Sequence, residues 1–416
     1  MSRRKQPKRE DGTAASKKAK LERELGSELG HGLKWKSAGT PDKNGVPPMV
    51  LLDSDKLEGR NKVAGFDIDW TIIATESGRK FATGASDWKW WHECVPQKLK
   101  QLHEDGFRVI FFSNQAGIEK GKAKLEDIQK KCTAIITQLG IPVYVFFSTG
   151  ESHYRKPGTE MWEYFVAHCN AGVKVDLSKC VYVGDAAGRP KEWAPGRAKD
   201  FSCSDRMFSF NIGVRFQTPE EFFLGEKPAT FAWNASNFDP KAVIANTRAE
   251  TKTFHSSKPE MIIMVGMPAS GKSFFVKKYL EPHGYVHVNR DTLGTPAKCF
   301  QKASEAVKSK KSVVIDNTNP SKSVRAEYIQ LAKKNNLPCR CFYLNVPKDL
   351  AHHLNYVRQN LTRGQVRRIP DVGYNVFHKN LEEPTTTEGF SQVIQLEFSP
   401  QFEDQKQEAL FKQWTC

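Results

Sequence analysis

Short apolar runs alternate with longer segments of helical period over most of this chain. The alternation starts at about residue 60, and a second series begins at Met261 after a break rich in Asn, Pro, Ser and Thr. This pattern predicts βαβ units that build parallel sheets. The predicted strands are 63–66, 109–112, 143–147, 181–183, 261–265, 286–288, 313–315 and 341–344, and the predicted helices are 124–139, 160–168, 303–309 and 324–333.

The two series predict two doubly wound α/β domains, each built on a parallel sheet. We place them at residues 59–223 and 259–416, with a linker at 224–258. Residues 1–58 are polar and poor in aromatics, and their first twenty positions carry eight Lys/Arg against two acids. Such a segment buries too little apolar surface to offset its ordering entropy, which predicts a disordered basic tail.

The charge balance points to a polyanionic partner. The net charge is +16, which favours nucleic acid or an anionic surface. No apolar run approaches the ~20 residues of a membrane span, and no signal peptide is expected. Nine scattered cysteines predict reduced thiols rather than disulfides or a zinc site. Basic clusters at 3–9 and 17–20 are typical of a nuclear localisation signal, or of a solvated tail.

Two carboxylates follow the first predicted strand. Asp67 and Asp69 stand two residues apart in AGFDIDWTII, where a parallel strand meets the active edge of its sheet. One carboxylate can attack phosphorus and form an aspartyl-phosphate, and the other can exchange a proton with the leaving oxygen. Such pairs also occur in turns and caps, so further groups are needed to identify a site.

Those further groups arrive in order near later strand ends. Ser113 offers a hydroxyl to phosphate oxygens, Lys156 offers positive charge, and Asp185 adds an acid for magnesium. The combination resembles the haloacid dehalogenase superfamily of phosphatases. The resemblance implies that Asp67 is the nucleophile and Asp69 the acid and base, with Ser113 and Lys156 on the phosphate. It also implies Mg²⁺ bound by Asp67, Asp185 and the Asp69 carbonyl, and substrate contacts from Asn114, Arg155 and Arg189.

The segment between Thr71 and Pro96 decides what kind of substrate can enter. Roughly two dozen residues can form a flap but not a cap domain that closes over a small molecule. An open site suits the end of a polymer. Tryptophans 88, 90 and 91 lie in this flap and could stack on unpaired bases, or could simply pack the flap against the core.

A glycine-rich loop follows the first strand of the later domain. MIIMVGMPASGKS contains Gly266-x4-Gly271-Lys272-Ser273, a complete Walker A loop. Its backbone N–H groups surround phosphate, its lysine reaches the β- and γ-phosphates, and its hydroxyl ligates magnesium. The loop predicts ATP and Mg²⁺. The residues expected at the nucleotide are Gly266, Ser270, Gly271, Lys272 and Ser273.

Other strand ends narrow the role of the later domain. Asp291 follows strand 286–288 and is placed to accept the proton of an attacking hydroxyl. Asp316, a Walker-B-like acid, and Asn317 follow strand 313–315 and are expected at the substrate, although Asp316 could also cap a turn. The arginines of NYVRQNLTRGQVRRIP predict a lid that stabilises charge, or a solvated basic face. The expected lid pair is Arg363 and Arg367.

A phosphatase and a kinase on one chain must act on different groups. A nucleic acid break offers two, a blocked 3′-phosphate and a bare 5′-hydroxyl. The stretches KVAGFDID, VYVGDAAGRPKEWAPGRAKDFSCSDR, GYVHVNRDTLG and VVIDNTNP resemble the polynucleotide kinase 3′-phosphatase family from about Lys62 onward. The resemblance implies a monomeric, nuclear DNA repair enzyme that acts on strand-break ends at nicks, gaps and double-strand ends.

Two departures from that family are visible. Animal members begin with a forkhead-associated domain that binds phosphorylated scaffold proteins, and a tail of about 58 residues is too short for such a β-sandwich. Trp70 stands where the family motif has glycine. Its indole either points away and repacks the base of the flap, which we favour, or crowds the mouth and alters which ends enter.

Three alternative functions remain open at this stage. An RNA end-healing enzyme would carry the same motifs, because sequence does not show how the 2′-position is read. A bifunctional enzyme for small molecules fits poorly with the missing cap and the charge of +16. A non-catalytic end-binding module fits poorly with two intact sets of reactive residues.

Overall fold

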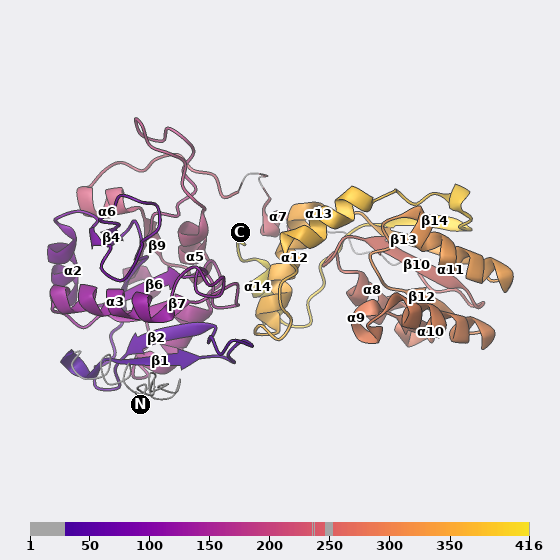
Figure 1. Cartoon of the computed structure of the whole chain (residues 1–416), viewed down its shortest axis with the longest axis horizontal. Coiled ribbons are helices and arrows are strands. Elements are labelled where there is room, and N and C mark those ends of the chain that lie inside the picture. Colours follow the sequence, from indigo (N-terminus) through magenta and orange to yellow (C-terminus); the bar gives the residue numbers. More distant parts are fainter. Residues whose placement is uncertain (1–29, 235, 237, 246–252, 416) are drawn as a thin grey trace, which may run out of the picture. The chain divides into compact units, whose positions relative to one another are not determined.

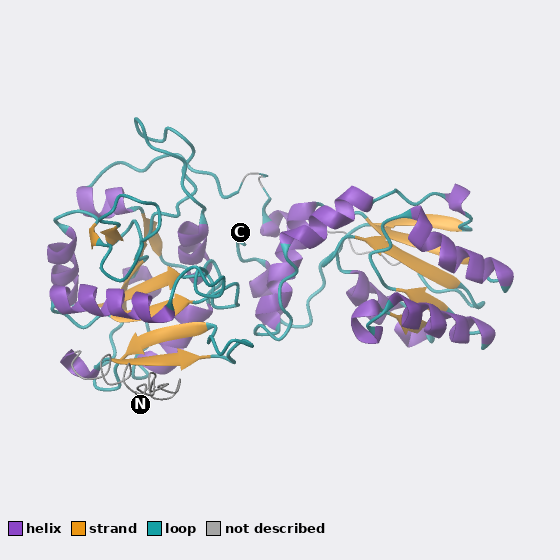
Figure 2. Cartoon of the chain, in the orientation of Figure 1, coloured by secondary structure: helices purple, strands orange, loops and turns teal. Residues whose placement is uncertain are grey.

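The computed structural model describes residues 30–234, 236, 238–245 and 253–415, which form two compact units (Figure 1). Met1–Ala235 and Trp414–Cys416 make up the first unit, and Ser236–Gln413 the second. Each unit holds strands surrounded by helices (Figure 2), so the predicted pair of α/β domains is confirmed. None of the helices in the described ranges combines the length and apolar character needed to cross a membrane.

The first unit is built on a seven-stranded sheet with the order β1-β2-β7-β6-β3-β8-β9. The strands β7, β6, β3, β8 and β9 pair in parallel, as predicted. A short antiparallel hairpin of β4 (Ile73–Ala74) and β5 (Lys89–Trp90) forms part of the flap. The parallel strands are β3 (Lys62–Phe66), β6 (Phe107–Asn114), β7 (Tyr144–Ser148), β8 (Val181–Val183) and β9 (Arg215–Gln217), and the main helices are α2 (Val95–Glu104), α3 (Leu125–Leu139), α4 (Glu160–Tyr164), α5 (Ser204–Ile212) and α6 (Pro219–Leu224).

The prediction of a disordered segment up to residue 58 is wrong for its described part. β1 (Lys34–Ala38) and β2 (Met49–Asp53) extend the sheet, and β2 pairs antiparallel with β7. Every residue of β2 is buried. The low average hydrophobicity of the segment concealed this one apolar run, MVLL. Residues 1–29, which carry the predicted basic clusters, lie outside the described residues.

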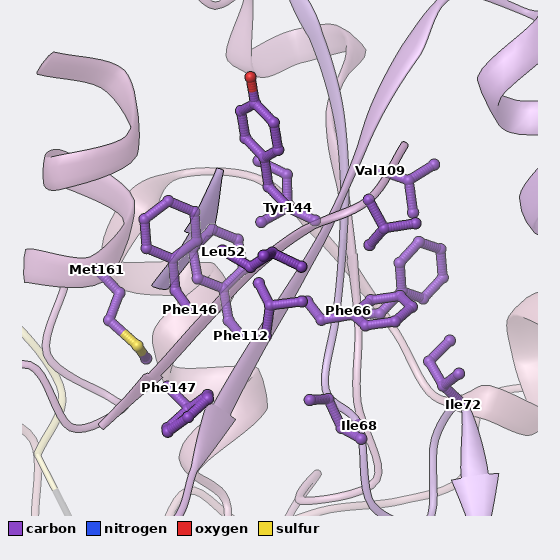
Figure 3. Close-up of a cluster of buried hydrophobic side chains, with 14 of the residues drawn as sticks. Leu52, Phe66, Ile68, Ile72, Val109, Phe112, Tyr144, Phe146, Phe147 and Met161 are labelled. Atoms are coloured by element: carbon purple, nitrogen blue, oxygen red, sulfur yellow. The ribbon is translucent and has the colours of Figure 1, made fainter. Parts of the chain in front are cut away.

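Aromatic side chains fill the core of the first unit around its central strands (Figure 3). Phe112 and Phe146 stack with their ring centroids 5.5 Å apart, and both are fully buried. Phe66 at the end of β3 packs edge-on against Phe111, 6.5 Å away. Dense aromatic packing of this kind fixes the ends of β3 and β6, the two strands that precede the candidate phosphatase residues.

The second unit is built on a five-stranded sheet with the order β11-β12-β10-β13-β14. All four strand pairs are parallel, as predicted. The edge strand β14 was not predicted, because its side chains are mostly exposed or half-buried. The strands are β10 (Met261–Gly266), β11 (Val286–Val288), β12 (Val313–Ile315), β13 (Cys339–Leu344) and β14 (Gln392–Leu396), and the helices include α8 (Lys272–Tyr279), α9 (Arg290–Leu293), α10 (Pro296–Lys308), α11 (Lys322–Lys334), α12 (Lys348–Leu361), α13 (Asp371–Asn380) and α14 (Gln405–Phe411).

The predicted linker at 224–258 is not a plain linker. The first unit continues to Ala235, and α7 (Pro240–Ala245) belongs to the second. Ile244 of α7 packs on an apolar cluster of that unit. The chain end also departs from the predicted boundary, because Trp414 stacks on Trp233 within the first unit, with ring centroids 4.6 Å apart. The residues that make these apolar contacts are few and distant in sequence. They therefore produce no hydrophobic period from which the contacts could be predicted.

Candidate active sites

The predicted phosphatase residues meet at the carboxyl edge of the first sheet. Asp67 follows β3, and its backbone N–H donates to the carbonyl of Val183 at 2.9 Å. Ser113 lies at the end of the neighbouring β6, and Asp185 follows β8 on the other side. Adjacent parallel strands therefore bring together residues that lie up to 118 positions apart in the sequence.

Lys156 holds the centre of this site. Its buried ammonium donates to Asp67 Oδ1 at 2.6 Å and to Asp205 Oδ1 at 2.7 Å. It also donates to the carbonyl of Phe112 at 2.7 Å and contacts the hydroxyl of Tyr182 at 2.9 Å. Burial alone would lower the pKa of Lys156, but the two aspartates raise it overall. The side chain is therefore a fixed positive charge beside the predicted nucleophile.

Three carboxylates crowd the same spot. One oxygen each of Asp67, Asp185 and Asp205 lies within 4.8 Å of the others. Burial raises the pKa of Asp67 to about 7, with Lys156 opposing the shift and Asp205 adding to it. Burial and the neighbouring acids also hold the pKa of Asp185 well above its usual range. Carboxylates this close repel each other unless a cation neutralises them, so their residues fit a site for a hard divalent metal.

Asp205 was missed by the sequence analysis. It lies in the first turn of α5, not at a strand end, and its Oδ2 accepts from the Ala186 N–H at 3.1 Å. Gly184 makes this approach possible, because a Cβ there would lie 2.4 Å from Asp205 Oδ2. The acid in SCSDR was the one local sign of it.

The second predicted acid, Asp69, is held by two donors. Lys131 Nζ lies 2.9 Å from its Oδ1, and Gln115 Nε2 donates to its Oδ2 at 2.8 Å. Gln115 also donates to Ser113 Oγ at 3.0 Å, which links the acid to the predicted phosphate-binding hydroxyl. Lys131 is almost fully buried on the inner face of α3. A lysine among the mainly apolar buried positions of this helix was a signal of its role in the sequence.

Three predicted substrate contacts of this unit have other partners in the structure. The prediction for Arg189 is wrong, because its buried guanidinium is paired with Asp200 at 2.9 Å and Glu220 at 2.7 Å. Asn114 bonds both backbone groups of Lys156 and so positions that loop instead of offering its amide to substrate. Arg155 lies 3.3 Å from Glu151.

The Walker A loop joins β10 to α8 in the second unit. Gly271 has φ 96°, a conformation that a side chain rarely adopts, at the point where the loop enters the helix. Lys272 Nζ donates to the carbonyls of Gly266 and Met267, both at 2.8 Å, and lies 3.4 Å from Ser270 Oγ. Burial lowers the pKa of Lys272 to about 8, although Asp316 and Asp291 oppose the shift.

Asp316 has the contacts expected of the Walker-B-like acid that the sequence predicted, and it also lines the cavity over the loop. Its buried carboxylate accepts from Ser273 Oγ at 2.6 Å and from Asn289 Nδ2 at 2.9 Å. His287 Nε2 lies 2.8 Å from the same oxygen, and its other ring nitrogen lies 2.7 Å from Glu281. Asp316 therefore sits behind the predicted metal-binding hydroxyl, where a Walker B acid belongs. The sequence analysis missed His287 and Asn289.

A cavity of about 1030 Å³ opens over this loop within the second unit. Lys272, Ser273, Asp291, Asn317 and Arg358 all line it. Asn317 also accepts the backbone N–H of Arg290 at 2.9 Å. Of the predicted arginine lid, Arg363 and Arg367 are exposed and do not line the cavity, whereas Arg358 of the same segment does, as does Arg290.

Comparisons with known proteins agree with both sites. The family model described as polynucleotide kinase 3 phosphatase matches residues 62–223, and an AAA domain model matches residues 261–372. The bifunctional polynucleotide phosphatase/kinase of Schizosaccharomyces pombe is 38% identical over 357 residues, which cover 84% of this chain and 83% of the relative.

A second relative matches the first unit. The polynucleotide 3′-phosphatase of Saccharomyces cerevisiae is 27% identical over 235 residues, covering 43% of this chain and 94% of the yeast protein. The two-site architecture is thus shared with the fission yeast enzyme along most of both chains. From its two sites and this similarity, the chain belongs to the bifunctional polynucleotide phosphatase/kinase family.

Proposed function

We propose that this chain repairs DNA strand-break ends in the nucleus. It removes 3′-phosphates and phosphorylates 5′-hydroxyls with ATP, so that a ligase can join the two ends. The observation that carries the proposal is that one chain holds a site suited to removing phosphate and a site suited to adding it. The same chain has a net charge of +16. The basic charge suits a substrate that carries many phosphates.

In the phosphatase reaction, Asp67 attacks the phosphorus of the 3′-phosphate. The phosphoryl group moves to the Asp67 carboxylate, and Asp69 gives its proton to the departing 3′-oxygen. Asp69 then takes a proton from water, which hydrolyses the aspartyl-phosphate. Lys156, whose Nζ lies 2.6 Å from Asp67 Oδ1, offsets the negative charge of the nucleophile and of the phosphoryl group throughout the reaction. Ser113, whose Oγ is linked to Asp69 through Gln115, offers its hydroxyl to a phosphate oxygen.

Magnesium fits both units by the chemistry of the donors. Asp67, Asp185 and Asp205 would hold one ion in the phosphatase site, and Ser273 with Asp316 would hold another beside the Walker A loop. When bound, the ion neutralises phosphate charge that would otherwise repel the carboxylates. The Asp69 carbonyl stays a predicted ligand.

In the kinase reaction, Asp291 accepts the proton of the attacking 5′-hydroxyl. Its backbone N–H donates to Asn289 Oδ1 at 2.8 Å, which fixes the start of α9 and leaves the exposed carboxylate at the cavity. Lys272 binds the β- and γ-phosphates of ATP, and Arg358 adds positive charge on another side of the cavity. The phosphoryl group moves from ATP to the 5′-oxygen.

The proposed partners are DNA ends at nicks, gaps and double-strand breaks. The short flap leaves the phosphatase site accessible to a chain end, which supports a polymeric substrate. We propose that the protein acts as a monomer and that repair scaffold proteins recruit it to these ends.

Two variants test the two-site model. Asp67→Ala should abolish release of 3′-phosphate while 5′-phosphorylation continues, and Lys272→Ala should do the reverse. The control is Lys333→Ala, an exposed lysine on α11, which should leave both activities intact. Oligonucleotides that carry a 3′-phosphate at one end and a free 5′-hydroxyl at the other report both reactions. Loss of both activities in either folded variant would refute independent sites.

The same assay separates DNA from RNA and from small molecules. DNA and RNA ends of matched sequence should give higher kcat/KM for DNA, and equal or higher values for RNA would replace the proposal with RNA end healing. Moderate salt or heparin should inhibit both reactions if polyanion contacts provide affinity. Activity on phosphorylated metabolites that resists heparin would point instead to a small-molecule enzyme.

A further inference from the structure

Three exposed aromatic residues are close in sequence to the acids of the phosphatase site. Trp70 directly follows Asp69, Phe81 belongs to the flap, and Phe201 precedes Asp205 by four residues. Their exposed fractions are 37%, 72% and 72%. Single exposed rings are common on protein surfaces, but apolar side chains that gather into one patch mark a binding site.

Lys80 joins these rings into one surface, which we call the Trp70 cluster (Trp70, Lys80, Phe81 and Phe201). Its ammonium lies 4.5 Å from the ring centre of Phe201 and 5.8 Å from that of Phe81. Its backbone carbonyl accepts the indole N–H of Trp70 at 3.2 Å. The cluster therefore combines flat apolar faces with a positive charge.

The backbone at Trp70 shows that its ring is held in place at a cost. Trp70 has φ 63°, a left-handed conformation that is unfavourable for a bulky side chain. Its N–H donates to the carbonyl of Ile73 at 2.7 Å, and Asp69 forms a bridge with Ile73. The half-exposed indole gains little from burial, so core packing does not account for this strained position.

We propose that the Trp70 cluster is a stacking platform for the nucleobase of the 3′-terminal nucleotide. The inference rests on the proposed function, which delivers a 3′-phosphate to Asp67. A base attached to that nucleotide must lie near the residue that follows Asp69. Aromatic faces stack on any unpaired base, and Lys80 attracts the backbone phosphate next to it. A paired 3′-terminal base at a nick has both faces stacked on neighbouring bases, so the platform favours single-stranded or frayed 3′ ends.

This assignment revises our interpretation of Trp70. The indole donates to the Lys80 carbonyl of the flap, as the favoured interpretation requires, yet its ring stays exposed one residue after Asp69. The residue then affects which ends bind and leaves the reacting acids unchanged.

The test compares two single-stranded DNA oligonucleotides that end in a 3′-phosphate. One has a normal terminal nucleotide, and the other has an abasic sugar at that position. Trp70→Gly, which tolerates the left-handed backbone, should raise KM for the normal strand by about 5- to 100-fold with little change in kcat, because base stacking accounts for that range. It should leave KM for the abasic strand unchanged. Trp70→Phe should retain much of the effect of the ring.

Phe81→Ala provides a second variant that removes an exposed ring without touching the strained backbone, and it should also raise KM for the normal strand alone. Unchanged kcat and KM of each variant on the abasic strand report that the first unit is folded. Equal KM changes on both strands, or none on either, would overturn the platform while leaving the proposed function intact. If the unmodified protein released phosphate from neither strand, the proposed function itself would fail, and the platform with it.

Discussion

Lys131 provides the sharpest test of how the phosphatase site is organised. Its ammonium lies 2.9 Å from Asp69 Oδ1, and its side chain is only 3% exposed, whereas that of Asp69 is 41% exposed. Burial would lower the pKa of Lys131, but Asp69 raises it overall. Lys131→Met keeps an unbranched side chain of similar volume and removes the donor. We predict a loss of catalysis without a loss of stability.

The expected magnitudes follow from these exposures. A buried ammonium with one partner is costly to desolvate, and an ion pair with a half-exposed carboxylate offsets that cost incompletely. The free energy of unfolding should therefore change by no more than about 1 kcal/mol in either direction. General acid–base catalysis is worth about 10²- to 10⁴-fold, and Gln115 still holds the other oxygen of Asp69. Formation of the aspartyl-phosphate should therefore slow by about 10- to 100-fold.

Single-turnover kinetics with two leaving groups checks this reasoning. A 3′-phosphorylated oligonucleotide expels an alkoxide that needs a proton, whereas p-nitrophenyl phosphate expels a stable phenolate. Loss of a correctly placed Asp69 should slow the oligonucleotide much more than the phenyl ester. Lys131→Arg keeps the charge and should recover part of the rate. Equal slowing of both substrates, with unfolding unchanged, would refute the claim that Lys131 acts through Asp69.

Three further predictions follow from the described contacts. Asp205→Asn should shift the magnesium concentration that activates the phosphatase upward by about 10- to 100-fold and leave the kinase unchanged, as a magnesium titration would show. Gly184→Ala should lower phosphatase activity and destabilise the first unit by about 1–3 kcal/mol in denaturant unfolding, because the new Cβ would meet Asp205 at 2.4 Å. ATP with magnesium at about 100 times its Kd should stabilise the second unit by about 2.7 kcal/mol. This stabilisation is measured as a rise in Tm, and Lys272→Met should abolish it. A rise in Tm that persisted in the variant would contradict the role of Lys272 at the phosphates.

Residues that follow apolar strands could be assigned from the sequence. Asp67 directly follows a buried strand, and Lys272 belongs to the Walker A loop that follows another. The hydrophobic pattern reveals both strands, so the position of each residue at the edge of its sheet could be predicted. The two sheets and most of their strands followed from the same pattern. β2 escaped notice because the polar segment around it lowered the average over any longer window.

Roles that depend on partners distant in sequence could not be assigned in this way. Arg189 looked like a substrate ligand, but Asp200 and Glu220 neutralise it inside the protein. Asp316 was expected to be a Walker-B-like acid near the substrate, and only the packing of β12 beside β10 shows that its carboxylate accepts a hydrogen bond from Ser273. Neither partnership is visible along the chain, because it joins elements that meet only once the sheet forms.

The sequence by itself determined two α/β units and the places of Asp67 and of the Walker A loop after their strands, because local backbone geometry and short spacings encode those features. Only the tertiary structure decided that Asp205 completes the acidic cluster, that Lys131 holds Asp69, and that the Trp70 ring lies exposed on a left-handed backbone. Each of these depends on side chains from different elements reaching a common point, and folding alone sets those distances.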